Sequence, residues 1–280
     1  MRPLRLAGAA IALALVAAFA SAGSRDKVFF LGPMKTGTTS LSKLFAGKGY
    51  NTCHGECMGK NWAVVTRSNS ASSPVLSQHD AFMDHGDHAD YVWLAKAYPT
   101  ARFVLNTREL KSWIVSRADH ARRNRVAAGC TPWGTASTCR RANSNFVDNS
   151  AGKIRSWIID GAEHQRKVIS FFDSSSQLRN RFAVVDVEGQ GPNSLNRVLD
   201  WVTRVNLKNM PTKTVVLRPK DVPLAQARTD IRPPDANSNS HSEATKEHVV
   251  KVIKELGCTV ATWHDTLYGP CAKQIKKNAS

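Results

Sequence analysis

Short apolar runs alternate with longer amphipathic stretches along most of the chain. Apolar runs at residues 27–31, 102–106 and 181–187 are each bounded by turn-forming or polar residues, which is typical of buried parallel strands. Between and after them, apolar residues recur at helical spacing and predict helices over residues 38–48, 91–98, 109–121, 153–172 and 194–205. Strands that alternate with helices predict an α/β fold, in three layers around a central parallel sheet.

Three segments break this pattern. Residues 68–77 are rich in Ser and predict a loop. Residues 122–152 lose the helical periodicity around Cys130 and Cys139, which predicts an inserted loop held by a disulfide. Residues 230–242, with two Pro and many Asn and Ser, predict a flexible connection. We therefore expect one domain over residues 23–280, with insertions near 68–77 and 122–152.

The N-terminus has the features of a targeting segment. Arg2 and Arg5 precede the apolar run from Leu6 to Ala20, and Ala20-Ser21-Ala22 fits a signal-peptidase site. We expect a cleaved signal peptide over residues 1–22. The apolar stretch from Leu6 to Ala22 also reaches the lower limit of a membrane span, roughly 17–25 residues, so a retained signal-anchor is the alternative. Both place the domain in the secretory lumen, in the Golgi or secreted.

The chain has 6 cysteines, and in an oxidising lumen their spacing favours local disulfides. The expected pairs are Cys53–Cys57, Cys130–Cys139 and Cys258–Cys271. A metal site at Cys53-His54-x-x-Cys57 is the alternative, but no second cysteine pair has a matching spacing.

Basic residues greatly outnumber acidic ones, 39 to 22, for a formal net charge of +17. Such an excess favours anionic partners. A luminal protein is not expected to meet nucleic acid, so a glycan or a polyphosphate cofactor is the better expectation. A solvated basic surface without one dominant partner is the other interpretation.

The segment from Gly32 to Thr39 lies between the first predicted strand and helix and resembles a phosphate-binding loop. In nucleoside-triphosphate P-loops a Lys follows the second Gly, and the next Ser or Thr holds magnesium. Here Thr38 occupies the Lys position, and Lys35 lies two residues before Gly37. Backbone N–H groups at the helix N-terminus would still hold an anion. The pattern thus favours an anion-binding loop without the magnesium-binding pair.

The run Lys35-Thr36-Gly37-Thr38-Thr39 resembles the 5′-phosphosulfate loop of PAPS-dependent sulfotransferases. The resemblance implies that these residues bind 3′-phosphoadenosine 5′-phosphosulfate (PAPS). It also implies that Lys35 stabilises the charge that develops on the bridging oxygen, and that no metal is needed. Met34 separates Pro33 from the lysine, which is one residue more than the family usually has.

A second motif supports this resemblance. Family members bind the 3′-phosphate through an Arg at a strand end and a Ser eight residues later, and Arg108 and Ser116 fit that spacing. A Tyr98-Pro99 turn before the strand resembles one subfamily. The Arg-Lys-Gly segment that often completes the phosphate site is absent, and Arg218 with Lys220 matches it only weakly.

The acceptor hydroxyl needs a general base. In relatives a His ends the strand that precedes the Arg strand, and His85 is the first candidate here, followed by Asp84 and then His54. An exposed loop His is the plain alternative. A metal cluster is a further one, at His79, Asp84, His85 and His88.

The resemblance implies sulfuryl transfer from PAPS to an acceptor hydroxyl, expected on an anionic or neutral glycan or glycoconjugate. Contact with a membrane is expected only if the N-terminal segment is retained. One alternative is a P-loop NTPase or kinase, in which Asp186 would serve as the strand-end magnesium ligand. The other is a secreted, non-catalytic polyanion binder.

Overall fold

The computed structural model describes residues 25–139, 145–187, 194–204, 215–216, 241–256 and 258. The predicted signal segment, most of the predicted connection at 230–242, and Arg218 and Lys220 lie outside the described residues.

The centre of the molecule is a parallel sheet. Within the described ranges it has six strands in the order β2-β5-β1-β6-β7-β8, and every pairing is parallel. The strands are β1 (Val28–Phe30), β2 (Thr52–His54), β5 (Ala81–Met83), β6 (Arg102–Thr107), β7 (Phe182–Asp186) and β8 (Val215–Val216). The strand that leads into the predicted anion-binding loop, β1, lies between β5 and β6 and runs parallel to both, so the loops that follow these three strands leave the same edge of the sheet.

Helices cover both faces of this sheet, and the predicted three-layer α/β fold is confirmed. Alternate residues of β1 enter different cores: Phe29 packs on one face, and Val28 and Phe30 on the other. The face with Val28 is covered by α2 (Thr38–Ala46) and α9 (Ser194–Arg204). The opposite face is covered by α3 (Trp62–Thr66), α4 (Pro74–Gln78), α5 (Tyr91–Ala97), α7 (Ala151–Asp173) and α8 (Ser176–Arg179).

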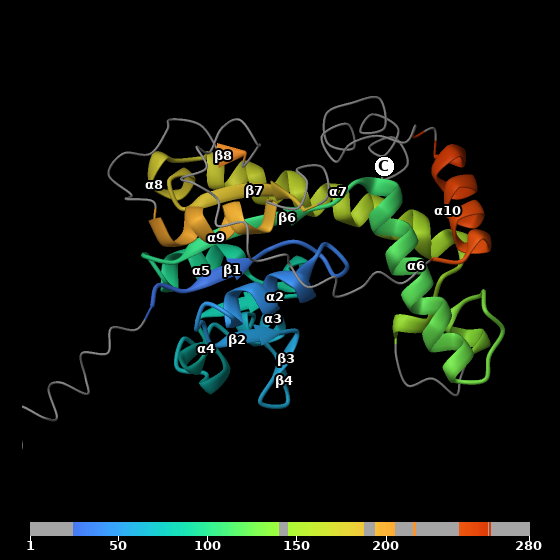
Figure 1. Cartoon of the computed structure of the whole chain (residues 1–280), viewed down its shortest axis with the longest axis horizontal. Coiled ribbons are helices and arrows are strands. Elements are labelled where there is room, and N and C mark those ends of the chain that lie inside the picture. Colours follow the sequence, from blue (N-terminus) through green and yellow to red (C-terminus); the bar gives the residue numbers. More distant parts are fainter. Residues whose placement is uncertain are drawn as a thin grey trace, which may run out of the picture.

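A second group of helices extends beyond the sheet. The helix α6 (Leu110–Ala127) packs against α7 and against α10 (Glu243–Glu255), and the three share their own apolar core (Figure 1). Asp119 on α6 is buried and accepts hydrogen bonds from Arg122 and Arg123. His241, just before α10, lies 3.4 Å from the same carboxylate. This cluster ties the C-terminal helix to α6.

The helix after β6 is longer than the sequence predicted. It continues to Ala127 rather than ending at 121, so the predicted loop at 122–152 is wrong at its start and begins after the helix. Arg125 explains the extension, because its fully buried guanidinium donates to the carbonyl oxygens of Thr131, Thr135 and Val147. The rest of this segment contains the short turns η2 (Ala136–Thr138) and η3 (Asn145–Val147).

Two further segments are more ordered than predicted. The predicted loop at 68–77 contains the start of α4, whose first residue is a proline, a residue suited to a helix start. Between β2 and α3 the chain forms a small hairpin from β3 (Glu56–Cys57) and β4 (Lys60–Asn61). Both were missed because each is only a few residues long.

The disulfide predictions hold where they fall on described residues. Cys53 is bonded to Cys57, and Cys130 to Cys139. The metal alternative at Cys53 and Cys57 is therefore wrong, because their sulfurs are joined to each other. Cys258 is also disulfide-bonded, and its predicted partner Cys271 lies outside the described residues. Among the described helices, none is long and apolar enough to cross a membrane.

Candidate active site

The candidate site lies at the carboxyl ends of β1, β2, β5 and β6, the edge at which open parallel sheets bind ligands. The loop at 31–37 leaves β1 and enters α2 at this edge. Lys35 and Gly37 both have positive φ, 71° and 77°. Gly37 precedes α2, and no side chain of the described residues caps that helix. The first-turn N–H groups of α2 are therefore left for an anion.

A buried asparagine holds the loop in shape. The Asn106 amide donates to the Thr36 carbonyl oxygen at 3.1 Å and to the Thr36 hydroxyl at 2.6 Å. Its Oδ1 accepts the Gly32 N–H at 2.9 Å. Gly32 is required here, because a Cβ would lie 2.1 Å from the Asn106 backbone oxygen. One side chain of β6 thus braces both ends of the loop that follows β1.

The second predicted motif meets the same loop. Arg108 Nη1 donates to the Lys35 carbonyl oxygen at 3.1 Å, and Trp113 Nε1 donates to the Met34 carbonyl oxygen at 3.0 Å. Ser116 lies on α6, less than one turn beyond Trp113, and is half-buried. The two sequence motifs, whose Lys35 and Arg108 are 73 residues apart, therefore converge on one place.

The loop residues differ in what they can offer a ligand. The side chains of Thr36 and Thr38 are buried, and the Thr36 hydroxyl also donates to the Pro33 carbonyl oxygen at 2.6 Å. Lys35 and Thr39 are only half-buried. Lys35 and Thr39 are therefore the more accessible of these side chains, while Thr36 supports the loop from inside.

The two first candidates for the general base follow β5 in an unusual turn. Asp84 and His85 have φ angles of 67° and 58°, so two consecutive non-glycine residues are left-handed. Their side chains are 15 % and 14 % exposed, with His85 Nε2 3.6 Å from Asp84 Oδ2. Trp62 Nε1 donates to the Asp84 carbonyl oxygen at 2.8 Å, and this hydrogen bond helps to hold the turn in place.

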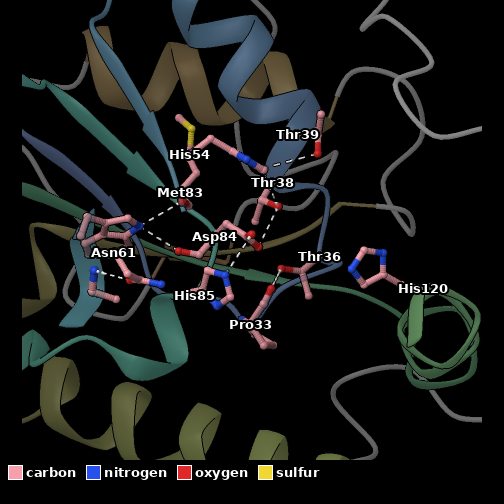
Figure 2. A network of polar contacts seen from close by, with 12 residues as sticks. Pro33, Thr36, Thr38, Thr39, His54, Asn61, Met83, Asp84, His85 and His120 are labelled. Carbon is pink, nitrogen blue, oxygen red and sulfur yellow. Dashed lines mark hydrogen bonds and ion pairs between the residues drawn. The ribbon is translucent and has the colours of Figure 1, made fainter. Parts of the chain in front are cut away.

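The third candidate, His54, reaches the same point from β2. Its Nε2 lies 3.3 Å from the Thr38 hydroxyl and 3.5 Å from that of Thr39. The Thr38 hydroxyl also donates to Asp84 Oδ1 at 3.3 Å. Figure 2 shows these side chains gathered around the start of α2. All three predicted bases therefore lie close to the loop, and Thr38 links two of them directly.

Charges of both signs act on Lys35. Burial lowers the pKa of Lys35 from its ordinary value of 10.5, and Arg123 and Arg108 lower it further, whereas the Asp84 and Asp119 carboxylates oppose the shift. The positive charges of Lys35, Arg108 and Arg123 repel one another, and a bound anion offsets this repulsion. The electrostatics of the loop are thus compatible with an anionic ligand.

Two residues of this site, Asn106 and His120, were not predicted from the sequence. Asn106 carried a signal, since this polar residue directly follows the apolar run Phe103–Leu105 in a fully buried strand. His120 lies on α6 with its ring directed towards the loop (Figure 2). Nothing in its sequence neighbourhood distinguishes it from a surface histidine.

The metal alternative at His79, Asp84, His85 and His88 finds no support. The His79 ring pairs with the Val75 carbonyl oxygen at 2.9 Å. Throughout the described residues, no group of three or more His, Cys, Asp or Glu side chains could hold a metal ion. Metal-free chemistry stays a prediction.

A sulfotransferase domain model matches residues 27–187, which is more than half of the chain. The chain therefore belongs to the sulfotransferase domain family, and it is a transferase of sulfuryl groups. A search of curated proteins finds no match. The matched range includes every predicted site residue, from Lys35 to Ser116.

Proposed function

We propose that the protein transfers a sulfuryl group from PAPS to an acceptor hydroxyl. The observation that carries this proposal is the convergence of the two donor motifs, in which Arg108 donates to the Lys35 carbonyl oxygen. Lys35, Gly37 and Thr39 are proposed to bind the 5′-phosphosulfate, with Thr36 and Thr38 shaping the loop. Arg108 and Ser116 are proposed to bind the 3′-phosphate.

The proposed reaction forms a bond between the acceptor oxygen and sulfur while the bond from sulfur to the bridging phosphate oxygen breaks. The leaving group is adenosine 3′,5′-bisphosphate. Lys35 stabilises the negative charge that grows on the bridging oxygen. His85 takes the acceptor proton, and Asp84, 3.6 Å away, orients the imidazole and stabilises its charged form.

A carbohydrate or glycoconjugate hydroxyl is the proposed acceptor. The formal charge of +17 supports an anionic or neutral glycan in preference to a cationic one. The two disulfides between described cysteines support a luminal location, in the Golgi or secreted, because such bonds persist in oxidising compartments. The signal peptide predicted over residues 1–22 supports the same location.

The donor is tested by ligand stabilisation. Adenosine 3′,5′-bisphosphate without magnesium should raise the melting temperature, whereas ATP with magnesium should not. Stabilisation by ATP and magnesium alone would favour the NTPase alternative. Heparin binding that is insensitive to substitutions at Lys35 and Arg108, with no transfer from PAPS, would favour the polyanion binder.

Activity is tested by screening acceptors with radiolabelled PAPS and comparing two lysine variants. Lys35→Ala should lower kcat about a hundred- to thousandfold, since the lysine acts on charge that develops in the transition state. Lys43→Ala, an exposed lysine on α2, is the matched control and should retain activity. Full activity of Lys35→Ala would overturn the mechanism.

The base is tested at His85 by chemical rescue. Because His85 has a φ of 58°, His85→Gly removes the imidazole without adding backbone strain. The variant should lose kcat by about a hundredfold or more, keep its affinity for the bisphosphate, and regain turnover with added imidazole. Normal turnover without imidazole would move the base to Asp84 or His54.

A further inference from the structure

His120 shares a helix face with residues that contact the donor loop. It lies four residues beyond Ser116 and seven beyond Trp113, so the three side chains point to one side of α6. Trp113 fixes the direction of that side, because its indole N–H donates to the Met34 carbonyl oxygen. Figure 2 shows the His120 ring directed from α6 towards the loop.

Charges of both signs surround His120. Lys35 from the loop and Arg123 from α6 act on it electrostatically, and Asp84 and Asp119 are the opposing charges. Arg123 is held by Asp119, with its Nη1 2.6 Å from the carboxylate. Arg108 lies beside the same lysine. The ring therefore lies close to Lys35, which we assign to the donor and whose carbonyl oxygen accepts a hydrogen bond from Arg108.

A hydrogen bond on the same helix orients the imidazole. The Asn124 amide nitrogen lies 3.5 Å from His120 Nε2. When the ring is neutral, the amide donates to Nε2, and the ring proton is then on Nδ1. Nδ1 can thus donate a hydrogen bond to an anionic oxygen.

We propose that His120 is a further donor-binding residue, which contacts the 3′-phosphate of PAPS beside Arg108 and Ser116. This inference rests on the proposed function. It adds a second residue from α6 to the proposed 3′-phosphate site, to which the sequence motifs assign only the Arg108 guanidinium and the Ser116 hydroxyl.

The proposal has a consequence for pH. Burial lowers the pKa of His120 to about 4, with Lys35 and Arg123 lowering it further and Asp84 and Asp119 opposing them. A bound phosphate offsets the burial and the two cations, so the ring takes up a proton on binding. Affinity then rises as pH falls towards the bound-state pKa. If that pKa returns to roughly 6.5, the gain between pH 8 and pH 6 is about fourfold.

The test compares two nucleotides by calorimetry. His120→Ala should weaken adenosine 3′,5′-bisphosphate about tenfold and leave adenosine 5′-monophosphate within about twofold, because only the first has a 3′-phosphate. His120→Gln keeps a hydrogen-bonding side chain for the case in which the alanine variant does not fold. His79→Ala is the control, since that ring pairs with the Val75 carbonyl oxygen.

The pH dependence supplies a second readout. Both His120 variants should lose the fourfold gain that the wild type shows between pH 8 and pH 6, and the titration of the nucleotide itself is common to all three proteins. Equal bisphosphate affinity and equal pH dependence in wild type and variants would overturn this inference alone. Equal weakening of both nucleotides would overturn the 3′-phosphate assignment. A wild type that binds no bisphosphate would overturn the proposed function and this inference together.

Discussion

The Asn106 brace can be removed with a single substitution. Asn106→Ala deletes three hydrogen bonds and leaves the Gly32 N–H and the Thr36 carbonyl without that partner, while the Thr36 hydroxyl keeps its bond to Pro33. A buried polar group left unsatisfied costs about 1–3 kcal/mol, so two cost about 2–6 kcal/mol. That is a large part of the 5–15 kcal/mol typical of a domain.

The expected result has two parts, in stability and in binding. Denaturant unfolding should show a loss in the free energy of unfolding within this range. Affinity for adenosine 3′,5′-bisphosphate should fall about tenfold or more, because the loop no longer holds its binding conformation before the ligand arrives. Calorimetry on the folded variant separates the second effect from the first.

The neighbouring residue on the same strand provides a matched control. Thr107 is also fully buried, but its hydroxyl donates to the Val185 carbonyl oxygen, away from the loop. Thr107→Val should cost about 1 kcal/mol of stability and leave bisphosphate affinity unchanged. If Asn106→Ala is no less stable than Thr107→Val and binds the bisphosphate as tightly as wild type, the brace does not have the role assigned to it.

Three further outcomes are expected. Gly32→Ala should abolish bisphosphate binding or soluble expression, because its Cβ would lie 2.1 Å from a backbone oxygen of β6; Gly152→Ala, with open space around it, should express and bind normally. Replacing Cys130 and Cys139 together by Ser should lower the melting temperature, and an unchanged value under oxidising conditions would show that this bond does not stabilise the loop. The pKa of Asp119 lies below its ordinary value, so the ionised carboxylate stabilises the fold fully above about pH 4, and this stabilisation is lost as pH falls through the lowered pKa. The melting temperature of Asp119→Asn should therefore differ most from that of wild type above pH 4, and the two should converge below it.

The sequence predicted the parts of the fold that local patterns determine. The apolar run at 27–31 became β1, and the amphipathic stretch at 153–172 became the centre of α7. Both patterns can be recognised from neighbouring residues alone, because a buried strand requires a run of apolar residues and a helix buried on one face requires apolar residues at helical spacing. A loop at 35–39 between the first strand and helix was predicted for the same reason, because the motif that indicates it consists of consecutive residues.

The features that were missed depend on residues distant in sequence. The end of α6 was predicted too early because Arg125 appears to be a surface residue until the loop that receives its hydrogen bonds is folded around it. Asn106 is 70 residues from Thr36, and its role exists only where β6 lies beside β1. His120 likewise comes close to Lys35 and Asp84 only through the approach of α6 to the loop.

The disulfide between Cys53 and Cys57 makes the position of one candidate base depend on the redox conditions in which the protein is produced. His54 lies inside the ring that this bond closes, and its imidazole reaches two hydroxyls of α2. Protein produced in a reducing cytoplasm would carry two thiols there, and the segment holding His54 would lose this covalent restraint while keeping the pairing of β2 with β5. Preparations from reducing and oxidising hosts are thus expected to differ in specific activity even where their total fold is the same, and thiol content becomes a quality criterion for any kinetic measurement on this enzyme.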